Sequence, residues 1–143
     1  MSSVARTGQT LLMAASSMLF AAFTSAMVVR RGLTGDWAAP EVPAWLWATA
    51  LLGPAASFCV ARGWVRGAVL LGSALVAAQV AAAAGLRMTV IGEAFLAVLM
   101  VAHAVHAAGG VAALARWGER AALYWHFVGA LWIYVLFLFG VWA

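Results

Sequence analysis

The feature that most constrains this chain is a series of long apolar runs, separated by short segments that carry arginine, glycine or proline. A helix that crosses a bilayer needs about 20 predominantly apolar residues, and five runs come close to that length. We therefore predict an all-α integral membrane protein, a bundle of five transmembrane helices. The predicted spans are residues 10–29, 44–61, 67–86, 90–115 and 121–142.

The composition excludes a soluble domain. Of the 143 residues, 67% are hydrophobic and 8% are charged, whereas a soluble domain carries about 25% charged residues. The basic residues are all arginines and lie in short loops, so there is no basic patch for nucleic acid. The single cysteine, Cys59, permits no internal disulfide and no c-type haem attachment motif. We expect residues 1–143 to form one transmembrane domain.

The distribution of arginines predicts the orientation in the membrane. Cytoplasmic loops carry an excess of arginine and lysine, and more arginines lie on the side where the chain begins than on the other. We therefore expect a cytoplasmic N-terminus and an external C-terminus. The first side carries Arg6, Arg62, Arg66, Arg116 and Arg120, and the other carries Arg30, Arg31 and Arg87.

Glu93 is the one acidic residue within a predicted span. A carboxylate inside the membrane is a candidate functional group, and a small transporter or proton path would use Glu93 with Gln79. The alternative is that Glu93 lies in the first helical turn, where the helix dipole favours a negative charge and Arg87 can pair with it. Thr89 is a plausible N-cap for this helix.

All three histidines fall in the last two spans. His103 and His106 are three residues apart, so they share one helix face about 60° from each other. Gly110 follows one turn later and permits close approach of a helix or a lipid. One interpretation is metal or haem ligation, including a b-type cytochrome with His126 as the second axial ligand. The other is hydrogen bonding between helices or to lipid headgroups.

The segment between the last two spans combines basic and aromatic residues. Tyr124 and Trp125 open the fifth span, where amphipathic rings favour the membrane interface. Arg116 and Arg120 precede them and are suited to bidentate contacts with lipid phosphates.

Two blocks of sequence in this region carry a resemblance to a known family. Residues 124–128 read Y-W-H-F-V and are followed by Trp132, and residues 103–110 read H-A-V-H-A-A-G-G. These blocks resemble the Y-W-H-F-V-D-x-x-W and H-G-L-H signatures of cytochrome c oxidase subunit III. The resemblance is to a short, five-helix form of the family.

Two further blocks match in the same order along the chain. Residues 16–23, S-S-M-L-F-A-A-F, resemble the S-E-x-M-L-F-x-x-F segment of that family. Trp37 with Pro40 and Pro43 resembles the W-P-P loop that follows it. The chain departs from the pattern at Ser17, where the family has glutamate, and at Gly129, where it has aspartate.

The resemblance implies a non-catalytic accessory subunit of a haem-copper terminal oxidase in aerobic respiration. Such a subunit packs on subunit I, with subunit II in the same complex, binds structural phospholipid and supports sustained turnover and proton uptake. Haem and copper then belong to partner subunits, and this chain carries no catalytic, metal or cofactor-binding residue. The expected location is a bacterial inner membrane, and an accessory subunit of nitric-oxide reductase is the sibling alternative. The lipid or packing candidates are His103, His106, Gly110, Arg116, Arg120, Tyr124, Trp125 and His126.

Overall fold

The computed structural model describes residues 3–33, 35 and 37–142, and the regular elements in this part of the chain are all helices. Four helical stretches are long and apolar enough to cross a membrane: Arg6–Leu33, Ala44–Ala61, Val65–Gly85 and Ile91–Val141. The architecture is therefore all-α, with the helices of a multi-pass membrane protein.

Each stretch corresponds to one or more helices. The first is α1 (Ser3–Leu33), and the third is α4 (Val65–Gly85). The second consists of α2 (Ala44–Ala48), the 3₁₀ helix η1 (Thr49–Leu51) and α3 (Leu52–Ala61). The fourth holds α5 (Ile91–Trp117), the 3₁₀ helix η2 (Gly118–Ala121) and α6 (Ala122–Trp142).

The helix ends differ from the predicted ones where charged residues were taken as breaks. α1 continues through Arg30 and Arg31 to Leu33, because basic side chains in a last turn interact favourably with the helix dipole. α5 likewise runs through Arg116 and ends at Trp117, just before Gly118, whose φ of +59° a glycine adopts without strain.

Proline interrupts the second stretch. Pro54 lies in the first turn of α3 and has no N–H to donate to the carbonyl of Ala50. The chain takes the tighter 3₁₀ form of η1 just before this position. The regular α-helical pattern is therefore interrupted between α2 and α3, just before Pro54.

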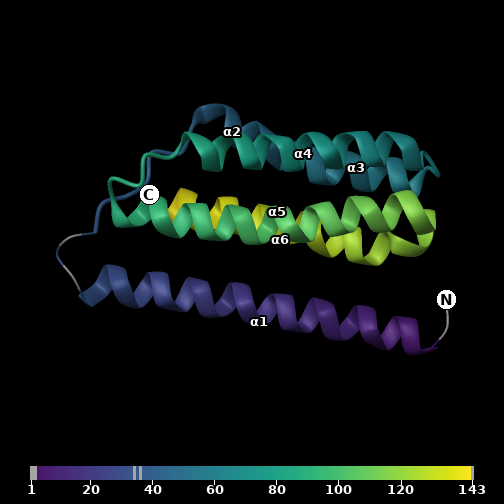
Figure 1. Ribbon diagram of the computed structural model, residues 1–143, viewed down its shortest axis with the longest axis horizontal. Helices are drawn as coiled ribbons and strands as arrows, with labels where there is room; N and C mark the ends of the chain where they lie inside the picture. Colours follow the sequence, from purple (N-terminus) through teal and green to yellow (C-terminus); the bar gives the residue numbers. More distant parts are fainter. Residues whose placement is uncertain (1–2, 34, 36, 143) are drawn as a thin grey trace.

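The helices lie side by side in layers. Figure 1 shows α5 and α6 together in one layer, α3 and α4 along one side of it, and α1 along the other. α1 begins at one end of the molecule and α6 ends at the opposite end. An apolar groove of about 430 Å³ separates α1 from α5, lined by Leu19, Phe23, Ala97, Val98, Val101 and Ala102.

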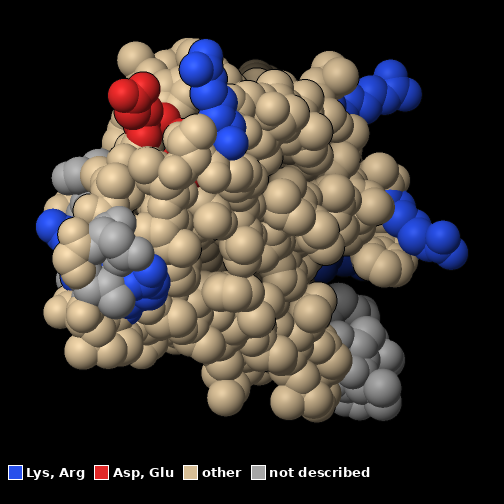
Figure 2. Space-filling model, turned by 60° about the vertical axis from the view of Figure 1, so that its left-hand side comes forward, with Lys and Arg blue, Asp and Glu red and all other residues tan. Residues whose placement is uncertain are grey.

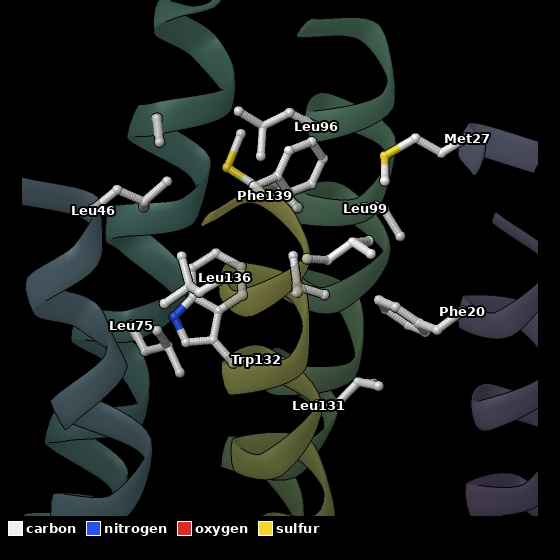
Figure 3. Packing of buried hydrophobic residues seen from close by; sticks show 14 residues of the cluster. Phe20, Met27, Leu46, Leu75, Leu96, Leu99, Leu131, Trp132, Leu136 and Phe139 are labelled. Carbon is white, nitrogen blue, oxygen red and sulfur yellow. The ribbon is translucent and has the colours of Figure 1, made fainter. Parts of the chain in front are cut away.

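The main hydrophobic core surrounds the second half of α6. Trp132, Leu136 and Phe139 point from α6 toward buried side chains of every neighbouring layer (Figure 3). Leu46 and Leu75 cover one side of them, from α2 and α4. Phe20 and Met27 of α1, together with Leu96 and Leu99 of α5, cover the other.

Glycines allow α3 and α6 to touch through their backbones. A Cβ atom at Gly53 would lie 3.2 Å from the Cα atom of Gly129. Such close approach of two helices is typical of small residues in membrane proteins. Gly129 is one of the positions where the chain departs from the pattern considered above, and a Cβ atom there would contact the backbone of Gly53 at 3.7 Å.

Candidate functional site

Buried polar side chains mark the centre of the bundle. Among the described residues, Ser16, Thr49, Gln79 and His103 are the buried polar side chains, and the last two have no exposed surface. A polar group removed from water and lipid headgroups is costly unless it is hydrogen-bonded. Each of the four has a partner, and the contacts of Ser16 with His106, of Gln79 with His103 and of Thr49 with Trp132 connect the layers of the bundle.

His103 of α5 bridges α4 and α6. Its Nε2 atom lies 2.9 Å from the backbone oxygen of Val128. A carbonyl oxygen only accepts, so Nε2 carries the hydrogen and donates it. In neutral imidazole Nδ1 is then the acceptor, and the amide nitrogen of Gln79 donates to it over 2.8 Å. These two contacts determine the tautomer of the ring.

Trp132 extends the network to the second helical stretch. Its ring lies 5.0 Å from the imidazole of His103, centroid to centroid, at 40°. Its Nε1 donates to the hydroxyl of Thr49 over 2.9 Å, and that hydroxyl donates in turn to the carbonyl of Leu46. Gln79, His103, Trp132 and Thr49 thus form one buried chain of contacts from α4 to η1, which we call the central polar network.

His106 takes part in a second, less buried set of contacts that reaches α1. Its Nδ1 atom lies 3.0 Å from the hydroxyl of Tyr124 and 3.5 Å from that of Ser16. Because the Ser16 hydroxyl donates to the carbonyl of Leu12, its oxygen is left as an acceptor toward the imidazole. Together with a 2.6 Å hydrogen bond between the hydroxyls of Thr24 and Tyr134, this ties α1 to the rest of the bundle.

Trp125 lies buried between two glycines of neighbouring helices. Its ring has no exposed surface and its Nε1 atom has no hydrogen-bond partner. A Cβ at Gly72 of α4 would come within 2.7 Å of this ring, and one at Gly110 of α5 within 3.0 Å. The surrounding helices enclose the ring, so within this chain Trp125 has a packing role. We call the space between the two glycines the Trp125 slot.

The third histidine lies apart from the other two. His126 is exposed, whereas His103 is fully buried and both of its ring nitrogens are engaged within the chain. The described residues contain no group of three or more His, Cys, Asp or Glu side chains placed to hold a metal ion. The structure therefore does not bring together the three imidazoles considered as possible ligands.

The two arginines of the aromatic-basic segment are also exposed. Arg116 lies in the last turn of α5 and Arg120 in η2. Both side chains lie where α5 ends and α6 begins, close in the sequence to the exposed His126.

Glu93 lies in the first turn of α5. Its Oε2 atom accepts hydrogen bonds from the backbone N–H of Thr89, at 2.7 Å, and from the hydroxyl of Thr89, at 3.2 Å. The prediction of Thr89 as N-cap is wrong: Val90 occupies that position without a side-chain cap, and the carboxylate reaches back to Thr89 instead. In the described part of the chain Glu93 forms no ion pair with Arg87.

Several members of these sites were not identified as site residues from the sequence. Gln79 was considered only as part of a proton path with Glu93 and not as a partner of His103, while Thr49 and Gly72 carried no signal at all. The central polar network has a structural role, because its hydrogen-bond donors and acceptors satisfy each other. Scans of protein-family models and searches of curated proteins and of solved structures found no match for this chain.

Proposed function

We propose that this chain is a non-catalytic accessory subunit of a haem-copper terminal oxidase, similar to a five-helix subunit III. In this proposal α1, the α2–α3 unit, α4, α5 and α6 each cross a bacterial inner membrane, with the N-terminus cytoplasmic and the C-terminus external. The haem and copper belong to partner subunits, above all subunit I. This chain contributes packing surfaces, structural phospholipid and support for sustained turnover.

One observation carries the proposal beyond the resemblance in sequence. The two blocks most similar to subunit III, residues 103–110 and 124–132, form one interface between α5 and α6. Within it His103 donates to the carbonyl of Val128 and its ring contacts Trp132. Gly110 faces the ring of Trp125. Residues that share a signature and also contact one another are typical of a common structural unit, and this supports the family assignment.

Co-purification tests the proposal directly. We expect the tagged chain, extracted in mild detergent from its native membrane, to bring down haem-containing subunits that consume oxygen when reduced. The absorbance spectrum and mass spectrometry of the eluate are the readouts. A stable chain that elutes without any haem protein would contradict the proposal, and a partner that reduces nitric oxide would transfer it to the sibling complex. A Soret band from the isolated chain would instead indicate a cytochrome.

His126 offers a more specific test of where the partner subunits bind. The ring is exposed and forms no hydrogen bond within the described part of the chain, so it contributes little to the stability of the fold. We expect His126→Ala to lower the yield of the complex at least about threefold while leaving the unfolding midpoint of the isolated chain unchanged.

Leu123→Ala, at another exposed position on the same helix, is the matched control for loss of surface area. An equal loss of yield in both variants would indicate nonspecific weakening of the surface. An unchanged yield for His126→Ala would exclude the ring from the partner interface.

A further inference from the structure

A cavity of about 650 Å³ lies at the end of the bundle where α4 ends and α2 and α5 begin. It is distinct from the groove beside α1, which is lined by apolar residues of α1 and α5. Its volume falls in the range of small-molecule sites, about 300–1,000 Å³. If the helices cross a membrane, this end lies at the level of the lipid headgroups.

The rim of the cavity carries charges of both signs. Arg87 and Glu41 are exposed and Glu93 is half-buried, and all three line the cavity. Figure 2, which turns this end of the molecule forward, shows acidic and basic side chains close together along its upper edge. Among the described residues Arg87 forms no ion pair with either acid. The charges are therefore available to a ligand.

The position of Glu93 is maintained by the protein. One of its oxygens accepts the backbone N–H and the hydroxyl of Thr89, which leaves the other free to face a ligand. Arg87 and Thr89 flank Met88, which adopts a φ of +55°. A left-handed conformation is uncommon for a residue with a long side chain. It reverses the chain between α4 and α5 and brings Arg87 and Glu93 to one cavity.

Part of the wall is apolar. Ala82 and Leu86 come from the end of α4 and Trp45 from α2, with its ring about half exposed. A half-exposed tryptophan is typical of the membrane interface, where its ring contacts both headgroups and chains. The cavity thus combines one guanidinium, two carboxylates and an apolar surface.

We propose that this cavity binds a zwitterionic phospholipid whose head carries a phosphate and a primary ammonium group. Arg87 donates to the phosphate, since a guanidinium matches phosphate oxygens in a bidentate manner. Glu93 and Glu41 accept hydrogen bonds from the ammonium group, and an acyl chain lies on Ala82, Leu86 and Trp45. The site needs only that the chain lies in a membrane and does not depend on an oxidase partner.

Native mass spectrometry of the purified full chain, titrated with single lipids, tests this site. We expect phosphatidylethanolamine to bind at least about tenfold more tightly than phosphatidylcholine, whose quaternary ammonium has no hydrogen to donate, or phosphatidylglycerol. Arg87→Gln should weaken phosphatidylethanolamine binding about tenfold. Glu93→Gln should reduce the preference over phosphatidylcholine to less than threefold.

Arg66→Gln, an exposed arginine in the first turn of α4 and thus at the opposite end of that helix, is the matched control and should leave binding unchanged. Glu41→Gln provides a second test of ammonium recognition that disturbs no hydrogen bond within the fold. Equal binding of the three lipids, or unchanged binding in Arg87→Gln and Glu93→Gln, would overturn the proposal. Because the isolated chain is used, this outcome is independent of co-purification with haem subunits.

Discussion

Replacing His103 with leucine is expected to lower the free energy of unfolding of the isolated chain by about 2 kcal/mol. The two side chains have similar volumes, so the loss arises from hydrogen bonding and not from a cavity. Gln79 has no exposed surface, and without the imidazole its amide is left without this partner in an apolar interior. A buried unsatisfied polar group costs about 1–3 kcal/mol. Unfolding in mixed micelles, followed by helix content, measures the change.

A double substitution distinguishes this cause from a general packing defect. When Gln79 and His103 are both leucine, no polar side chain of the pair is left, and the carbonyl of Val128 still takes part in the backbone hydrogen bonding of α6. We expect the double variant to unfold within about 1 kcal/mol of the unmodified chain, and so to be more stable than His103→Leu alone. Ser73→Leu, at an exposed position of α4, is the control for added apolar volume. If the losses of stability in Gln79→Leu and His103→Leu simply add up in the double variant, the two side chains are not coupled as the central polar network requires.

The course of the helices follows from the apolar runs, but their ends do not. The runs located each helical stretch because backbone hydrogen bonds must be satisfied within a segment that enters lipid. Arg30, Arg31 and Arg116 were read as breaks, yet each lies within a helix. An arginine near the end of a helix is compatible with a helix that ends before it and with one that continues through it. Only the backbone of the following residues decides between the two.

The roles of the histidines show where sequence reasoning stops. The spacing of His103 and His106 correctly places both rings on one side of α5. An angle of about 60° between them is nevertheless enough to give them different neighbours. His103 contacts α4 and α6, whereas His106 contacts Tyr124 and approaches Ser16 of α1. Pairing of this kind depends on which helices are adjacent, and no local pattern encodes it.

Trp125 could not be placed from its own surroundings in the sequence. A tryptophan near the start of a membrane helix favours the interface, but that general preference does not indicate which helices enclose the ring. The decisive residue is Gly72, distant in sequence, which forms one wall of the Trp125 slot. Burial of the ring therefore depends on the packing of α4 against α5, which places Gly72 and Gly110 on either side of it, and not on the residues around Trp125.

The second large expected effect concerns the Trp125 slot. Two adjacent glycines separate this effect from the general effect of replacing a helical glycine. Gly110 faces the ring of Trp125 at 3.0 Å, measured from the Cβ that a substitution would add, whereas Gly109 has no atom within 4 Å of that position. Leucine favours a helix over glycine by up to about 1 kcal/mol at either position. We expect Gly109→Leu to leave stability unchanged or slightly raised, and Gly110→Leu to lower it by about 3 kcal/mol through overpacking. Unfolding in mixed micelles measures both.

Removing the ring should remove the penalty. In a Trp125→Leu background the Gly110→Leu change is expected to cost less than about 1 kcal/mol, because the atoms that crowd the new side chain belong to the indole. Trp125→Leu itself lowers stability, since a large buried ring is lost, so the comparison is made between the two Trp125→Leu chains. An unchanged penalty in that background would place the steric conflict elsewhere, for example against Tyr124, whose ring lies 3.8 Å from the same point. If the stability cost of Gly110→Leu disappears, Gly110 is required because it leaves room for the ring of Trp125.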